Sequence, residues 1–414
     1  METISAADRA ILRELAAKQR QYAESPAMKQ LEADWFKLNT FRGGRPLVQL
    51  ELWTFGDEVI TPRMRCTGDT ARSIENRLLR GYLNHELFAD DCLVQPYFPV
   101  QWSSYFIPFG VEIPVTHAVD AQGRNVGYAF TYPIVDLERD IEKLGPSRYG
   151  ADRKETQEAL DFYNDIFGDV LPAKMTGRSP AISPSYDMLR LMGTEAMFTN
   201  MCDYPELFAE TTNRLADDWL AYYDFLTAEG LLLPTCAGEW LGQGSLCYTD
   251  ELPAEAKSTR DIWLHSNAQE TVGLSPTMFA ELFFPSYQKL FERFGLVSFG
   301  CCEPVDGIWE NCLSKAPNLR KVSISPWCNE KYIGEQLRGK KIVYFRKPTP
   351  NLLGVGGTLD EDAVRAMMRT TLEAAQGCTL EFAQRDVYTI GHDVAKARRY
   401  VALMHEEIEQ HWKG

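Results

Sequence analysis

Long apolar runs, an excess of positive charge and a nucleotide-binding glycine motif are all absent from this sequence of 414 residues. No stretch approaches the roughly 18–20 apolar residues that a membrane-spanning helix needs, so no membrane partner is expected. The first residues, Met1 to Ser5, lack the basic and then apolar order of a secretory signal peptide. The sequence therefore predicts a cytoplasmic protein.

Basic residues are outnumbered, because 43 Lys and Arg stand against 58 Asp and Glu and give a net charge of −15. A surface this acidic repels phosphate backbones, so no nucleic-acid partner is expected. Hydrophobic residues make up 45% of the chain, which is enough to build a large core.

Ten cysteines are spread irregularly along the chain, without the density of a disulfide-stabilised fold. In a protein without an export signal they are expected to be reduced thiols, most of them small core residues. Cys301 and Cys302 are the exception, because two adjacent thiols form a chemically unusual pair.

The chain is predicted to be a single domain over residues 1–414, built in three parts. Residues 1–90 form a helical N-terminal extension with one strand candidate, Leu47–Trp53. Residues 92–150 are rich in proline, glycine and aromatic residues without a clean period, which predicts an irregular insertion or lid. Strand–helix alternation follows in the C-terminal half.

That alternation is read from short apolar runs separated by amphipathic helical stretches. Pro285 is expected to divide the helix that opens at Ser275 and Pro276. The predicted strands are Ile262–His265, Leu296–Phe299, Lys321–Ser325, Ile342–Phe345 and Thr379–Ala383. Because no Gly-x-Gly-x-x-Gly follows a strand, an α/β fold with a closed (β/α)₈ TIM barrel is favoured over a doubly wound nucleotide-binding sheet.

In such a barrel the active site gathers at the carboxyl ends of the strands. That rule selects polar residues that directly follow the predicted strands: His265, Gln269, Glu270, Cys301, Cys302, Glu303, Lys347 and Asp386. Gln269 and Glu270 fit acid–base work or substrate orientation, and they equally fit a simple helix start.

Two thiols at one strand end suggest a zinc site, since soft thiolate ligands suit this metal. Cys301 and Cys302 with His265 are the predicted metal residues, and Glu303 or Asp386 would complete the set. Adjacent cysteines point in divergent directions, so one is expected to bind metal and the other to pack. The alternative is a tight, dry strand end with no metal.

Glu239 lies in a glycine-rich stretch, residues 238–244, that is interpreted as a flexible loop over the barrel mouth. There Glu239 would position the substrate. An ordinary solvated loop is the alternative.

Several motifs resemble a branch of the uroporphyrinogen decarboxylase-like superfamily. They are Gly300-Cys301-Cys302-Glu303-Pro304, the Ser325-Pro326-Trp327 segment, Arg346-Lys347-Pro348 and the final Arg385-Asp386. The match covers about residues 200–414.

The resemblance implies one of two activities, because the superfamily holds decarboxylases and zinc-dependent methyltransferases that exchange methyl groups with corrinoid proteins or thiols. The decarboxylases' arginine-rich N-terminal segment has no counterpart here. The methyltransferases present His-x-Cys at the strand end, and here Cys301 matches while Phe299 stands in place of the histidine. No cysteine follows the last strand, where Asp386 is the nearest candidate.

The favoured interpretation is a methyltransferase acting on a small molecule, with zinc at Cys301 and a cobalamin-type corrinoid carried by a separate partner protein. A homodimer is expected from the family resemblance. One alternative is a carboxy-lyase acting on a small carboxylated or aromatic substrate, with Lys347, Arg346 and Asp386 as charge partners. Another is a non-catalytic ligand-binding barrel.

Overall fold

The computed structural model describes residues 3–119 and 125–413. Its α-helices are α1 (Ala6–Ala23), α2 (Pro26–Asn39), α3 (Gly56–Ile60), α4 (Asp69–Arg80), α5 (Leu83–Leu87), α6 (Leu137–Asp140), α7 (Arg153–Phe167), α8 (Pro184–Asp203), α9 (Pro205–Ala228), α10 (Pro276–Leu282), α11 (Phe284–Arg293), α12 (Asp306–Trp309), α13 (Glu330–Leu337), α14 (Asn351–Gly354), α15 (Glu361–Ala374) and α16 (Val394–His411). Its strands are β1 (Leu47–Leu50), β2 (Phe98–Val100), β3 (Ser103–Ile107), β4 (Val115–Val119), β5 (Asn125–Phe130), β6 (Arg148–Asp152), β7 (Ala173–Met175), β8 (Trp240–Gly242), β9 (Ser245–Leu246), β10 (Trp263–Ser266), β11 (Leu296–Phe299), β12 (Leu319–Ile324), β13 (Val343–Arg346) and β14 (Thr379–Gln384).

Six strands form one parallel sheet in the order β1-β14-β13-β12-β11-β10. The first strand of the chain therefore lies beside the last, with Leu47 paired to Glu381. Each predicted strand of the C-terminal half is present within two residues of its expected ends. The fold is a mixed α/β fold around a central parallel sheet.

Beyond β10 the sheet continues in fragments rather than as a full ladder. An isolated parallel bridge joins Ala181 to His265 of β10, and β7, which precedes it, pairs with β2. Among the described residues no ladder joins β2 to β1, so the ring of strands predicted by the sequence is not closed by hydrogen bonds. The described residues thus form a parallel sheet with paired fragments at one side, and the predicted closed barrel is not shown.

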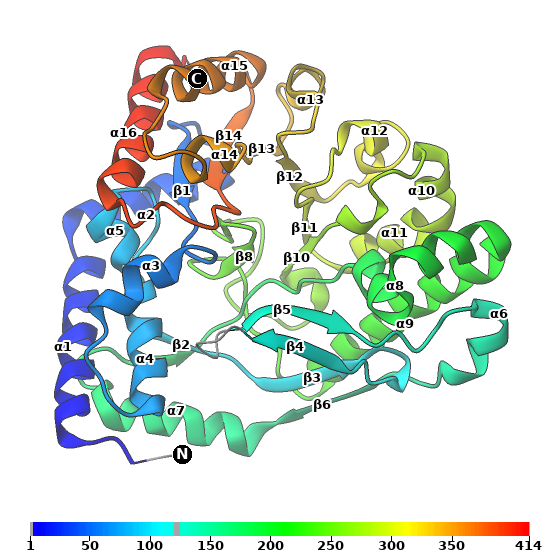
Figure 1. Cartoon of the computed structure of the whole chain (residues 1–414), viewed down its shortest axis with the longest axis horizontal. Helices are drawn as coiled ribbons and strands as arrows, with labels where there is room; N and C mark the ends of the chain where they lie inside the picture. Colours follow the sequence, from blue (N-terminus) through cyan, green and yellow to red (C-terminus); the bar gives the residue numbers. More distant parts are fainter. Residues whose placement is uncertain (1–2, 120–124, 414) are drawn as a thin grey trace.

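The β8–β9 hairpin lies against the inner face of this sheet. A Cβ atom on Gly242 would lie 3.0 Å from His265 in β10, and one on Gly244 would lie 2.7 Å from Ala383 in β14. Lys321 of β12 donates from Nζ to Ser245 Oγ at 2.6 Å. Because one hairpin reaches the middle and both sides of the sheet, the inner face is concave; Figure 1 shows β8 near its centre. The loop predicted to lie over the mouth is instead packed inside.

Helices cover the opposite face, where Phe299 of β11 packs its ring against Tyr287 and Phe291 of α11. Local sequence sets where these helices begin. Ser275 caps α10 by accepting the amide of Met278, and Pro285 stands at the second position of α11. The predicted division at this proline is confirmed, since proline is tolerated only in the first turn of a helix.

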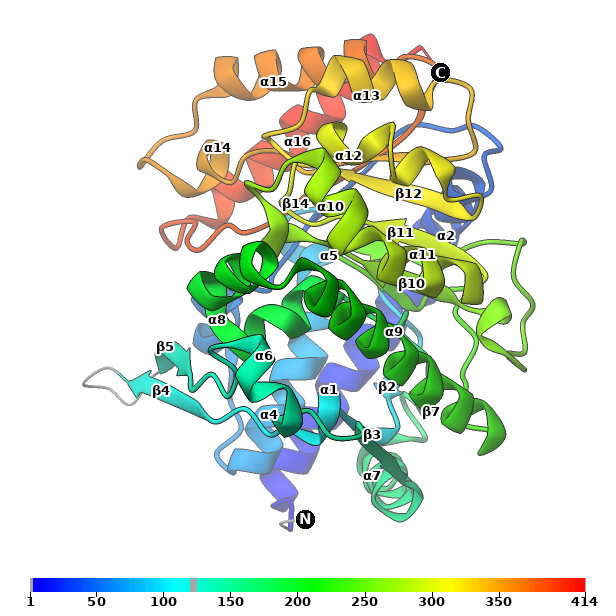
Figure 2. The same ribbon diagram turned by 90° about the vertical axis from the view of Figure 1, so that its right-hand side faces the viewer.

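The N-terminal region is helical except for β1, which joins the central sheet. Residues 92–150 contain several short strands, including the β4–β5 hairpin that extends away from the rest of the molecule in Figure 2. A role for this region as a lid stays a prediction. No helix in the described part of the chain is long and apolar enough to cross a membrane.

Candidate functional site

A cavity of about 160 Å³ opens at the carboxyl ends of β11 to β14. Its lining residues are Cys301, Cys302, Ser325, Pro326, Trp327, Lys347, Pro348, Pro350, Arg385 and Asp386. Four of the residues selected from the sequence therefore line one small space: the two thiols, the lysine and the aspartate. This is the convergence that the parallel-sheet prediction required.

Cys301 is surrounded by donors and positive charge. Its Sγ lies 3.4 Å from Cys302 Sγ and 4.0 Å from Nη1 of Arg385. A hydrogen bond from Cys302 and the charges of Lys347 and Arg385 lower the pKa of Cys301 to about 7, although burial opposes them. The sulfur is therefore set up to be a thiolate near neutral pH.

Cys302 holds the proton of this thiol pair. Its Sγ lies 3.6 Å from Oδ2 of Asp386, so a carboxylate faces Cys302 while cations face Cys301. The contact with Cys301, together with burial, raises the pKa of Cys302. The two adjacent cysteines thus have different chemical roles. Asp386 itself has a left-handed backbone, with φ of 57°, which directs the chain into the cavity.

Lys347 is a buried ammonium group, 3% exposed. Its Nζ donates to Oε1 of Gln243 at 2.9 Å and to the backbone carbonyl of Cys301 at 3.1 Å. Among the described residues no carboxylate lies at ion-pair distance from it, and burial lowers its pKa. A buried cation without a counter-ion is costly and marks a candidate functional residue.

Glu303, expected in acid–base work, is buried with both oxygens in use. They accept the backbone amides of Cys301 and Ala268, each at 2.8 Å. The carboxylate therefore ties the loop after β11 to the loop after β10. The structure gives Glu303 the role of holding the backbone of Cys301 in place.

His265 is buried, and neither ring nitrogen has a hydrogen-bond partner among the described residues. Burial, with the charges of Lys347 and Arg385, lowers its pKa to about 3, so the imidazole is neutral. The described residues contain no group of three His, Cys, Asp or Glu side chains arranged to hold a metal ion. In these positions the donors do not fit the expected zinc site, which stays a prediction.

Three other selected residues lie outside the thiol cavity. Glu270 accepts a hydrogen bond from Ser185 of α8 at 2.7 Å, and burial raises its pKa. Gln269 is exposed. Glu239 accepts the backbone amide of Ala237 at 2.8 Å and lines a separate cavity of about 310 Å³. Their predicted roles in catalysis have no geometric support from contact with Cys301.

Sequence reasoning missed Gln243, Arg385 and Glu51. Arg385 directly precedes the selected Asp386, and its Nε donates to Oε2 of Glu51 at 2.7 Å. Gln243 lies between two glycines at the tip of the β8–β9 hairpin. The only sequence signal for Gln243 was that glycine pair, which indicates a turn but not where the turn points.

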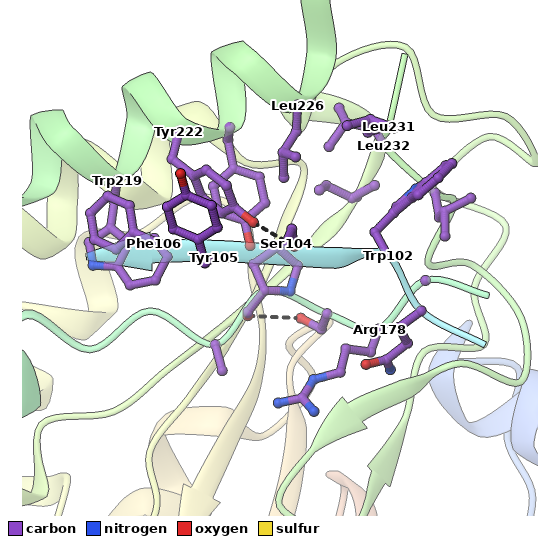
Figure 3. A pocket seen from close by; sticks show the side chains of 18 of the residues that line it. Trp102, Ser104, Tyr105, Phe106, Arg178, Trp219, Tyr222, Leu226, Leu231 and Leu232 are labelled. Carbon is purple, nitrogen blue, oxygen red and sulfur yellow. Dashed lines mark hydrogen bonds between the residues drawn. The ribbon is translucent and has the colours of Figure 1, made fainter. Parts of the chain in front are cut away.

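A larger cavity, about 350 Å³, lies between β3, α9 and residues 176–181. Figure 3 shows Trp219, Phe106 and Tyr222 toward one end and Trp102 with Leu231 toward the other. Its lining includes no cysteine, histidine, lysine or carboxylate. The cavity combines aromatic and aliphatic side chains with Arg178 and several hydroxyl groups, while the candidate reactive groups lie at the smaller cavity.

No protein-family model and no curated protein matches this sequence. Among solved structures, a methyltransferase from Methanosarcina mazei is similar with a TM-score of 0.50 and 14% identity, over 91% of this chain and 98% of that one. A protein described as a vitamin-B12 independent methionine synthase from Listeria monocytogenes is similar over 60% of this chain and 68% of its own, with 14% identity and a TM-score of 0.31. At this identity the first likeness shows the fold alone.

Proposed function

We propose that this protein is a methyltransferase acting on a small molecule, and that Cys301 is the sulfur at which the methyl group is transferred. The observation that carries the proposal is the position of Cys301 Sγ, in a cavity at the strand ends beside Lys347 and Arg385. The fold likeness to a methyltransferase supports the reaction class at a general level.

In the first half-reaction the thiolate of Cys301 attacks the methyl carbon of a donor. A sulfur–carbon bond forms, the bond from the methyl carbon to the donor atom breaks, and the electron pair stays on the leaving group. Lys347 and Arg385 hold the sulfur of Cys301 in the thiolate form that makes this attack. Cys302 retains its proton throughout and keeps donating to the sulfur of Cys301.

In the second half-reaction an acceptor nucleophile takes the methyl group from Cys301. The sulfur–carbon bond breaks, and its electron pair returns to a thiolate that is stabilised by its neighbours. A thiolate of lowered pKa is a better leaving group, so the same environment serves both halves. A thiol or the corrinoid of a partner protein is the proposed acceptor.

The test uses methylcobalamin as donor and a small thiol as acceptor, followed by the change in cobalamin absorbance. Wild-type protein is expected to accelerate the loss of methylcobalamin, and peptide mass spectrometry should find one methyl group on Cys301. The Cys301→Ser variant should do neither, while Cys202→Ser, at an exposed cysteine of α8, should behave as wild type. Absence of both signals in the wild type contradicts the proposal.

The corrinoid partner is a finer part of the proposal, and zinc is a separate expectation, because the donors of the described residues do not fit a zinc site as they are placed. Metal analysis of the purified protein tests zinc: about one ion per chain that is lost in Cys301→Ala would assign Cys301 to metal binding in place of methyl transfer. A homodimer and the partner protein are tested by the size of the protein alone and in mixtures with a corrinoid protein.

A lyase acting on a small carboxylated substrate is the second candidate. The observation that favours it is the buried Lys347, which has no carboxylate partner at ion-pair distance among the described residues. Release of carbon dioxide from a substrate, without methyl transfer from methylcobalamin, would favour the lyase.

A further inference from the structure

Hydrogen-bond donors of the candidate site converge on one oxygen atom. Oε1 of Gln243 accepts from Lys347 Nζ at 2.9 Å and from Nη1 of Arg385, and it lies 3.0 Å from Cys301 Sγ. Both donors are cations, yet the acceptor is a neutral amide. A neutral acceptor satisfies hydrogen bonds but does not neutralise charge, and a carboxylate in the same place would do both.

The nearby carboxylates are already in use. Glu51 accepts from Nε of Arg385 at 2.7 Å, and Glu303 accepts two backbone amides. Asp386 faces the thiol of Cys302. Lys347 is therefore left with the amide oxygen of Gln243 and one backbone carbonyl. Within the described residues no carboxylate lies at ion-pair distance from Lys347, and the negative charge beside it is the thiolate of Cys301.

The hairpin tip is built to place Gln243 there. Gly242, Gln243 and Gly244 have φ values of 130°, 57° and 87°, a run of left-handed backbone that is unfavourable for the one residue with a side chain. Glycine is required on either side because a Cβ atom would crowd His265 or Ala383. This tight turn directs the amide at the two cations.

We propose that Lys347 and Arg385 bind the carboxylate group of a small substrate, and that the amide oxygen of Gln243 occupies the place of that carboxylate until the substrate arrives. This inference rests on the proposed function for its use of the same site, and it adds the chemical class of the substrate. The carboxylate oxygens replace the amide oxygen, and the side chain of Gln243 turns away.

The cavity size limits how large that substrate end is. A volume of about 160 Å³ corresponds to roughly five water molecules at about 30 Å³ each. That space holds a carboxylate and two or three further atoms. Binding there brings the neighbouring carbon of the substrate close to the sulfur of Cys301.

The test compares two alkylating reagents that differ in charge, iodoacetate and iodoacetamide. Both form a bond from Cys301 sulfur to carbon and release iodide, so a change in the thiolate population cancels in the ratio of their rates. Peptide mass spectrometry resolves Cys301 from Cys302. The iodoacetate-to-iodoacetamide ratio at Cys301 is expected to exceed the ratio for glutathione by at least about tenfold, since charged hydrogen bonds are the stronger ones.

Two variants test whether the charge of Lys347 causes the preference of Cys301 for iodoacetate. Lys347→Met should bring the ratio at least threefold closer to that of glutathione. Lys341→Met, which removes an exposed lysine just before β13, should leave it unchanged. A wild-type ratio equal to that of glutathione, or a raised ratio that Lys347→Met leaves unchanged, overturns the inference.

The Gln243→Glu variant provides a test that does not depend on the folding of Lys347→Met. It places a carboxylate of the chain among the two cations, so the melting temperature is expected to rise by about 2 °C and the iodoacetate preference to disappear. A lower melting temperature with the preference intact overturns the inference. The melting temperature and the alkylation ratio do not require methyl transfer. These measurements therefore test the carboxylate site separately from the proposed function.

Discussion

Two lysines are buried in the same sheet, and their partners differ. Nζ of Lys321 in β12 lies 2.8 Å from Oε2 of Glu381. Lys347, just after β13, donates hydrogen bonds, among the described residues, to the amide of Gln243 and a backbone carbonyl. Burial lowers the pKa of both. The first is a complete ion pair near the beginning of its strand, and the second is an incomplete one at the carboxyl end. The difference separates a charge that stabilises the fold from one that awaits a ligand.

The largest expected effect is on stability, from Lys321→Met. It leaves Glu381 buried without its cation, so the free energy of unfolding should fall by about 3–5 kcal/mol. Chemical denaturation measures this. The double variant Lys321→Met with Glu381→Leu should recover most of the loss, since both charges are gone. A single variant as stable as the wild type would remove the contrast between the two lysines.

Lys347→Met should change the activity strongly and the stability little. Its free energy of unfolding is expected to change by less than about 1 kcal/mol, because no buried carboxylate is left behind. Its kcat/KM for methyl transfer should fall about thirtyfold, or about 2 kcal/mol, the range of a charged hydrogen bond. Steady-state kinetics beside a denaturation curve separates the two effects. A loss of stability as large as that of Lys321→Met would give both lysines a structural role.

The pH dependence of alkylation sharpens the comparison. The thiolate is the reactive form, so the rate with iodoacetamide should be low in acid and rise with pH, with a midpoint near about 7 for Cys301. Removing the charge in Lys347→Met should move the midpoint up, toward the ordinary thiol value of 9.0. Lys341→Met removes the same charge at an exposed position and serves as the control. An unshifted midpoint in Lys347→Met would show that Lys347 does not act on the sulfur.

The smallest effect is expected from Gln243→Ala. Loss of the shared acceptor should lower the free energy of unfolding by about 1 kcal/mol. Alkylation of Cys301 by iodoacetamide should become faster, because the amide oxygen no longer lies 3.0 Å from the sulfur. The exposed Gln288→Ala, on α11, should stay within about 0.5 kcal/mol of wild type. Slower alkylation in Gln243→Ala would mean that the amide holds the site open rather than filling it.

The sequence predicts the strands of the C-terminal half well, because the ends of these strands are set by residues next to them in the chain. Leu296–Phe299 was predicted with the bounds of β11, because the run is apolar and ends at a glycine. Leu231–Leu233 is equally apolar but forms no strand. Strand pairing depends on neighbours that are distant in sequence, and no apolar run carries that information.

The residues of the candidate site also divide into those that local sequence could place and those that it could not. Cys301, Lys347 and Asp386 were found because parallel strands bring their carboxyl ends to one edge. Glu270 and Glu239 follow the same kind of sequence cue but are held by Ser185 and by the backbone of Ala237. The hydrogen-bond partners of a polar group are often distant in sequence, so the sequence pattern does not reveal them.

By itself, then, the sequence determined the strand ends and the reactive residues that they present, since strand periodicity and breaking residues act over a few positions. Only the tertiary structure decided that Lys321 meets a carboxylate while Lys347 meets the amide of a glutamine 104 residues away. Charge neutralisation depends on contacts of a few ångströms. Such contacts are created by the folded hairpin and sheet, not by the order of residues along the chain.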